Sequence, residues 1–177
     1  MPILKIARLG HPVLLARAAP VEDAAAPDIQ GLICALAETM ADAGGVGLAA
    51  PQVHVPLRLF VFHVPASRAR AGAEIPPRAV INPILTPVEA AGRETDWEGC
   101  LSIPGLRAAV PRWRQVWLAG LDEAGEPFEE ILSGFAARVV QHETDHLDGV
   151  LYPMRVEDLR LFGYNEEIER YPREIPA

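Results

Sequence analysis

The sequence predicts an α+β protein in which mainly antiparallel sheets pack around a central helix. Two segments, at about 28–43 and 133–148, show the three- and four-residue apolar spacing of amphipathic helices. Between them, short runs rich in β-branched and apolar residues follow one another directly. Strands in succession, rather than in alternation with helices, favour antiparallel sheets over a doubly wound parallel sheet.

The first 20 residues are predicted to form an extended arm, because Pro2, Pro12 and Pro20 disfavour a helix. The first helix follows at about 28–43 and ends at Gly44 and Gly45. Cys34 lies on the apolar pattern of this helix and is expected in the core.

The middle of the chain is predicted to supply the strands. These are expected at 57–64, 79–85, 106–110, 116–121 and 128–132. Residues 65–77, rich in Ala, Arg and Pro, are expected to form a loop, and 122–127 a hairpin turn. The second helix is expected to start at Ser133 or Gly134 and to stop before Gly149. A tail from Arg155 is expected to open with a short helix and to end irregularly at Pro172 and Pro176.

Composition narrows the class of protein. A length of 177 residues indicates a single domain, 1–177, in which 155–177 is a short C-terminal tail. The formal charge of -8 argues against sequence-specific nucleic-acid binding over a broad surface, but leaves room for a local basic patch. Two cysteines suit a reducing compartment. Since the sequence has neither a signal-like start nor a segment of membrane-spanning length, we expect a cytoplasmic protein without a membrane partner.

The second predicted helix carries the most informative motif. His142 and His146 are four residues apart, with Glu143 beside the first. On a helix this spacing places both imidazoles on one face, where they can share a metal ion, and it turns Glu143 toward a water on that ion. The motif therefore predicts a hydrolytic metal site.

A catalytic metal site usually needs a third protein ligand. Cys100 and Glu166 are the candidates. A long helix would have to bring Glu166 to the ion, as in thermolysin-like proteases, and Pro153 and Gly163 interrupt that segment. A closed structural metal site in a binding protein is the further alternative; it would need a fourth ligand and would have no use for Glu143.

Three segments in order resemble the motifs of the peptide deformylase family. They are Gly45-Val-Gly-Leu-Ala-Ala-Pro-Gln52, Glu98-Gly-Cys-Leu-Ser102 and Gln141-His-Glu-Thr-Asp-His-Leu147. The similarity spans most of residues 1–155. The first segment also fits a dinucleotide fingerprint, but a helix rather than a strand precedes it, so nucleotide binding is not expected.

The resemblance implies a role for each matching residue. Metal ligation falls to Cys100, His142 and His146, with Glu143 as general base and acid. The Gln52 side chain and the Leu101 backbone N–H would stabilise an oxyanion. Substrate binding is implied for Gly45, Val46, Gly47 and Arg107. Arg138 occupies a position where some relatives carry an apolar residue against the methionine pocket.

The resemblance also implies the cofactor and the partners. The family's usual ion is Fe²⁺, and Zn²⁺, Ni²⁺ or Co²⁺ can occupy the same site. The substrates would be N-formylmethionyl peptides and nascent chains, which release formate. The resemblance leaves open a transient ribosome association, although the residues from Arg155 onward hold more acids than arginines.

Overall fold

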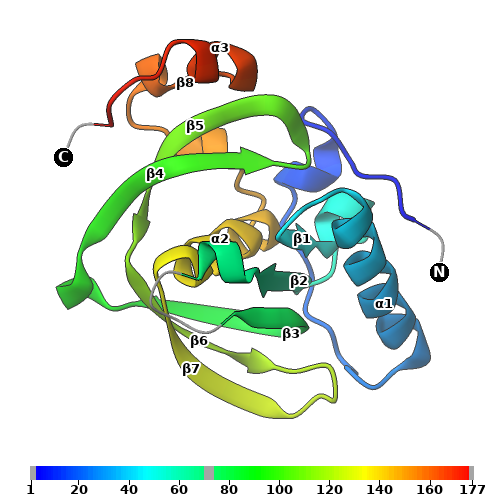
Figure 1. Cartoon of the computed structure of the whole chain (residues 1–177). Coiled ribbons are helices and arrows are strands. Elements are labelled where there is room, and N and C mark those ends of the chain that lie inside the picture. Colours follow the sequence, from blue (N-terminus) through cyan, green and yellow to red (C-terminus); the bar gives the residue numbers. More distant parts are fainter. Residues whose placement is uncertain (1–2, 70–73, 176–177) are drawn as a thin grey trace.

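The computed structural model describes residues 3–69 and 74–175. Helix α2 (Gly134–Leu147) runs through the middle of the molecule, between a five-stranded sheet and a curved β4–β5 hairpin (Figure 1). The predicted α+β class, with antiparallel sheets around the motif-bearing helix, is confirmed.

Two antiparallel sheets form the framework. The larger has the order β1 (Gly47–Ala49), β2 (Leu59–Val64), β3 (Ile75–Pro87), β6 (Gln115–Leu121) and β7 (Pro127–Ser133). The smaller has the order β4 (Arg93–Cys100), β5 (Ile103–Trp113) and β8 (Phe162–Tyr164). The predicted hairpin turn joins β6 and β7, where the Asp122 carboxylate accepts the N–H groups of Ala124 and Glu126.

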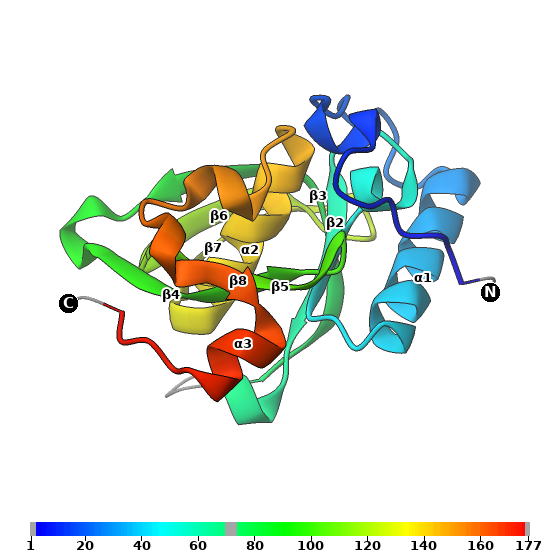
Figure 2. The same ribbon diagram turned by 90° about the horizontal axis from the view of Figure 1, so that it is seen from above.

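Two further α-helices and six short 3-10 helices occur among the described residues. The α-helices are α1 (Pro27–Asp42), within one residue of the prediction, and α3 (Asn165–Arg170). The 3-10 helices are η1 (Pro12–Leu15), η2 (Ala50–Val53), η3 (Ala66–Arg68), η4 (Glu89–Ala91), η5 (Tyr152–Arg155) and η6 (Leu159–Leu161). Figure 2 shows α1 at one side of the molecule and α3 next to β8 at another.

Helix α2 is held by apolar packing and by a defined end. Ala137, Val140 and Leu147 are fully buried against residues of β2, β3 and β6. Gly149 follows the helix in the left-handed region, with φ of 72°, and a Cβ there would lie 2.6 Å from the Leu15 carbonyl oxygen. Only glycine combines this conformation with this close approach. The apolar packing therefore fixes how deeply the helix that bears the histidines is buried, and Gly149 fixes where it ends.

Several expectations were wrong in detail. Cys34 is exposed, because it falls on the outer side of α1. Strand β3 starts at Ile75, inside the expected loop, of which 70–73 lie outside the described residues. Strands β1 and β4 were not predicted.

Both ends of the chain also differ from the expectation. Beyond Arg155, β8 pairs with β5 before α3, so the segment is more ordered than a tail with one short helix. The arm contains η1, and its Pro2, like Pro176 at the other end, lies outside the described residues. Within the described part of the chain, no helix combines the length and apolarity needed to cross a bilayer.

Candidate metal centre and substrate pocket

The structure brings Cys100, His142 and His146 together. Their candidate ligand atoms all lie within 4.8 Å of one another, and the Cys100 Sγ is 3.3 Å from the His146 Nε2. Cys100 ends β4, whereas both histidines come from α2, where one helical turn separates them. A thiolate and two imidazoles suit zinc or ferrous iron and leave a coordination position for water. The donor set therefore fits a catalytic divalent metal.

The electrostatics of the three donors favour this fit. Burial opposes ionisation of the Cys100 thiol, but the neighbouring His146 and His142 outweigh it, and the pKa of Cys100 falls well below its ordinary value. The Ser102 N–H also donates to the Cys100 Sγ, at 3.4 Å. Since the thiolate is the form that ligates metals, the site holds its sulfur ready for a cation.

Glu98 orients the first histidine. Its Oε2 lies 3.0 Å from the His142 Nδ1, which leaves the Nε2 as the atom of that ring that could ligate a metal ion. Arg112 binds both carboxylate oxygens of Glu98, at 2.9 and 3.0 Å. Although burial raises the pKa of Glu98, the His142 and Arg112 hydrogen bonds hold it well below its usual range. These contacts with Arg112 brace the carboxylate that holds His142.

Asp145 and Asp148 flank His146 in the sequence, where either could hold that ring in place. Asp145 instead binds Arg112 and Arg155, and Asp148 binds Arg58. Both aspartates lie on the side of α2 that faces away from the donors, so their sequence proximity to His146 is misleading.

Glu143 is buried at the edge of the donor group. Burial raises the pKa of Glu143 to about 7, and its Oε2 has no hydrogen-bond partner among the described residues. Gly47 of β1 lies directly over it, so close that a Cβ on Gly47 would be 2.1 Å from the Glu143 Oε1. A buried carboxyl with a pKa near neutrality can both accept and donate a proton at physiological pH.

Gln52 reaches the same site from η2. Its Oε1 accepts the Ala49 N–H at 2.9 Å, which aims the Nε2 at the Ser102 Oγ (3.1 Å) and toward the Cys100 Sγ (3.5 Å). Leu101 follows Cys100 and also lines the pocket. An amide donor and a backbone segment thus flank the donor group.

A pocket of about 450 Å³ opens over these groups. Gly45, Val46 and Gly47 form one wall, with Trp97, Leu106, Phe135 and Val139 among the apolar residues that line the rest. Arg107, expected near the substrate, is not among the lining residues. Its guanidinium lies over the Trp97 ring and 3.5 Å from the Glu169 carboxylate.

Two residues near the centre, Ser102 and Tyr152, escaped the sequence reasoning, whereas Arg138 had been placed beside the pocket. Ser102 contacts both Gln52 and Cys100, and its position two residues after the cysteine was the available signal. Tyr152 stacks on the His142 ring with centroids 6.2 Å apart, for which the sequence offers no signal. Arg138 is a lining residue whose guanidinium binds Glu98. Glu166, the alternative third ligand, lies exposed on α3.

The antiparallel fold and the HExxH helix, with a third donor from a strand, define the chain as a metal-dependent hydrolase. Comparison with known proteins narrows the class. The family model described as polypeptide deformylase matches residues 3–161. Peptide deformylase 1 of Nitrosomonas europaea is 46% identical over 168 residues, which cover 94% of this chain and 93% of the relative. This chain belongs to the polypeptide deformylase family.

Solved structures agree with this assignment. The peptide deformylase of Thermotoga maritima matches with a TM-score of 0.81 and 38% identity, covering 89% of this chain and all of the other. A class I type b peptide deformylase of Acinetobacter baumannii, solved with Met-Ala-Ser bound, matches with a TM-score of 0.79 and 34% identity over 88% of this chain and 99% of the other.

Proposed function

We propose that this hydrolase removes the N-formyl group of N-terminal formylmethionine, and releases formate, in the pocket between α2, β4 and β1. Removal of that group from new polypeptides is the metal-dependent activity of the family to which the chain belongs. The observation that carries the assignment to this pocket is the convergence of one thiol and two imidazoles beside the buried Glu143.

Cys100, His142 and His146 would hold a single divalent ion. A bound ion would supply a nucleophilic water at neutral pH and polarise the formyl carbonyl. We propose Fe²⁺, with Zn²⁺, Ni²⁺ or Co²⁺ as substitutes, because the mixed sulfur and nitrogen donors suit these metals.

Glu143 would move the protons. Its raised pKa lets the carboxylate accept a proton from the attacking water and return it to the departing nitrogen. Burial removes competing solvent, and Gly47 leaves the space in which the carboxyl lies. In this scheme, proton transfer depends on a residue that need not ligate the ion.

Gln52 and Leu101 would stabilise the oxyanion. The Gln52 Nε2 is already directed at the donor group by the Ala49 contact, so it would need little reorganisation during the reaction. One such donor is typically worth about 3 kcal/mol in the transition state.

The wall from Gly45 to Gly47 would bind the peptide as an added strand, through main-chain hydrogen bonds. Phe135, Val139 and Trp97 would contact the methionine side chain. Arg107 would act at the outer end of the peptide, since it lies beyond the pocket lining. We propose nascent chains as the partners and the cytoplasm as the location. The catalytic unit would be a single domain that includes residues 155–177.

The direct test is release of formate from formyl-Met-Ala-Ser, together with metal analysis, under anaerobic conditions. Glu143→Gln should retain the metal and lose about 100-fold or more in turnover. Cys100→Ala should lose the metal. Exposure to air should reduce the activity of the ferrous form.

Glu166→Gln is the matched control, since it removes an exposed carboxyl on α3 and should change neither quantity. Metal loss in Glu166→Gln with retention in Cys100→Ala would instead support the thermolysin-like arrangement. Unchanged turnover in Glu143→Gln would remove the proposed base.

A further inference from the structure

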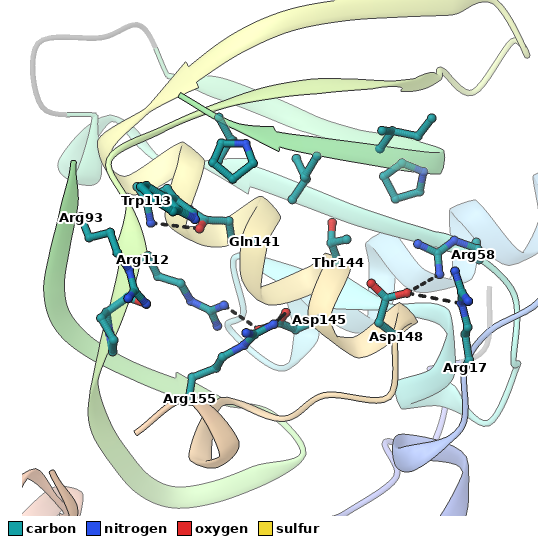
Figure 3. Close-up of a pocket in the computed structure, with 16 residues that line it drawn as sticks. Arg17, Arg58, Arg93, Arg112, Trp113, Gln141, Thr144, Asp145, Asp148 and Arg155 are labelled. Atoms are coloured by element: carbon teal, nitrogen blue, oxygen red, sulfur yellow. Dashed lines mark hydrogen bonds and ion pairs between the residues drawn. The ribbon is translucent and has the colours of Figure 1, made fainter. Parts of the chain in front are cut away.

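A second pocket lies beside α2 (Figure 3). It has a volume of about 390 Å³ and shares no lining residue with the substrate pocket. The helix contributes Gln141, Thr144, Asp145 and Asp148, spaced three and four residues apart. This spacing defines one helical face, opposite His142 and Glu143. The deformylase reaction leaves this rear pocket unused.

Positive charge gathers in the rear pocket. Its lining includes five arginines from separate parts of the chain, namely Arg17, Arg58, Arg93, Arg112 and Arg155. The only carboxylates among the lining residues are Asp145 and Asp148. This excess of cationic side chains occurs in a chain whose formal charge is -8. The pocket is therefore suited to an anion.

One end of the pocket is already neutralised. Asp145 accepts hydrogen bonds from Arg112 at 2.6 Å and from Arg155 at 2.7 Å. Arg112 is further bound to Glu98, and Arg93 lies 3.6 Å from the Glu157 carboxylate. These guanidinium groups hold the structure together and have little capacity for a ligand.

At the other end of the rear pocket, two guanidinium groups have N–H donors available for a ligand. Asp148 accepts from the Arg58 NH1 at 2.7 Å, but it lies 3.8 Å from the Arg17 Nε. The Arg17 side chain is 82% exposed. Each guanidinium carries five N–H donors, and this single carboxylate faces two of them. Both arginines can thus donate to an additional acceptor.

Thr144 supplies an independent indication. Its Oγ1 is buried and has no hydrogen-bond partner among the described residues. Figure 3 shows the side chain projecting from α2, between the Arg112–Asp145–Arg155 group and the Arg17–Asp148–Arg58 group. An unpaired buried hydroxyl is destabilising unless a ligand or water completes it. The hydroxyl therefore marks a place where a polar group should bind.

We propose that the rear pocket binds a phosphate-class oxyanion, held by Arg17 and Arg58 and by a hydrogen bond from Thr144. Guanidinium groups match the oxygen geometry of phosphate, and its several acceptor oxygens can meet two arginines and a hydroxyl at once. The wall formed by Pro83, Ile84 and Leu85 leaves an apolar surface for the esterified part. A free phosphoester and a phosphate of an RNA backbone share this chemistry.

The test is an NMR titration of the zinc-loaded full chain with inorganic phosphate at constant ionic strength. We expect saturable shifts in the amides of Thr144, Arg58 and their neighbours. Arg17→Gln and Thr144→Val should each weaken the phosphate Kd about tenfold, through loss of one charge-assisted contact. Asp148→Asn should tighten binding, because it removes the competing carboxylate.

Arg8→Gln is the control, because Arg8 is exposed and lines neither pocket. Absence of saturable shifts, equal weakening in Arg8→Gln and Arg17→Gln, or shifts confined to the substrate pocket would each overturn the proposal. Parallel titrations with adenosine monophosphate and a short RNA distinguish the two sources, and specific binding of either one supports the site. Formate release does not enter this test, so its failure leaves the proposed function untouched.

Discussion

Gly47 lies close against the Glu143 carboxyl in the substrate pocket. The glycine has no side chain, and the space that a Cβ would fill is occupied by the Glu143 carboxyl. The proposed base can therefore stay buried under β1 without being displaced from the donor group. The requirement for glycine here is steric rather than conformational, because Gly47 has no positive φ.

Gly47→Ala should reduce formate release about tenfold or more while leaving the fold intact, because the new methyl group must push Glu143 out of position. The measurement is kcat and KM for formyl-Met-Ala-Ser, with the thermal midpoint recorded in parallel. Gly31→Ala is the matched control, since a Cβ at Gly31 meets nothing within 4 Å. Equal activity of the two variants would show that the close contact has no catalytic consequence.

Arg138 ties the helix to the β4–β5 hairpin. Its NH1 donates to the Glu98 Oε1 and to the Val110 carbonyl, each at 2.8 Å, and its NH2 donates to the Glu94 carbonyl at 2.7 Å. The residue is buried and also lines the substrate pocket. A guanidinium bound to the β4–β5 hairpin thus forms part of the pocket wall.

Arg138→Leu should lower the free energy of unfolding by about 3 kcal/mol, because it leaves buried carbonyls and part of a carboxylate without partners. We also expect altered discrimination between formyl-Met and formyl-norleucine peptides, since the pocket wall changes. Urea unfolding and KM measurements check the two parts. Exposed Arg114→Leu provides the control, and equal unfolding free energies for both variants would contradict the structural role.

Strand β8 extends the sheet whose strand β4 ends at the proposed ligand Cys100. Phe162 and Tyr164 pair with Ala108 and Leu106 of β5, and Phe162 packs against a buried cluster around Tyr152. Tyr152 in turn stacks on His142. The segment after Arg155 therefore supports the wall of the candidate metal centre.

Truncation after residue 161 should destabilise the chain by about 2 kcal/mol or more, because it uncovers the Phe162 contact surface and the edge of β5. Thermal and urea unfolding measure this loss. Truncation after residue 170 is the control, since it keeps β8 and α3. If the shorter chain unfolds at the same urea concentration as the control, β8 does not stabilise the domain.

Across the whole molecule, a series of ion pairs links the candidate metal centre to the rear pocket. His142 contacts Glu98, Glu98 binds Arg112, and Arg112 binds Asp145, which also binds Arg155. This chain of contacts joins β4, β5, α2 and η5. The Glu98 side chain is only 5% exposed, so its charge is compensated by its partners rather than by water.

These ion pairs predict that the free energy of unfolding decreases at acidic pH. Burial raises the folded-state pKa of Glu98, but hydrogen bonds from His142 and Arg112 outweigh this effect and lower the pKa. As the pH falls, the carboxyl is therefore protonated in the unfolded chain before it is protonated in the folded chain. The contribution of Glu98 to the free energy of unfolding is complete above the unfolded carboxyl pKa of about 4.3. It is lost progressively as the pH falls below that value. Urea unfolding of the metal-free chain between about pH 3 and pH 7 measures this slope.

Glu98→Gln should lose much of the acid dependence, and Glu166→Gln should keep it. An identical pH profile for wild type and Glu98→Gln would mean that the network does not control acid stability. Since removal of the metal also removes a ligand specific to the folded state, the comparison requires all variants to be metal-free.

The sequence determined the local features of this protein. Apolar spacing of three and four residues located α1 and α2 closely, and the four-residue interval placed both histidines on one helical face. Strand β4 escaped prediction because its residues are mostly charged or exposed. It is held instead by pairing with β5 and by bonds from Arg112 and Arg138 to Glu98.

Tertiary structure alone decided which distant groups meet. Cys100 contacts a histidine 46 positions away, Glu98 holds another 44 positions away, and Asp145 turns from the donors toward two arginines. Helical periodicity is a property of neighbouring residues, so it can be read along the chain. Contacts between α2 and the sheets depend on strand register and packing, which bring together residues that no local pattern relates.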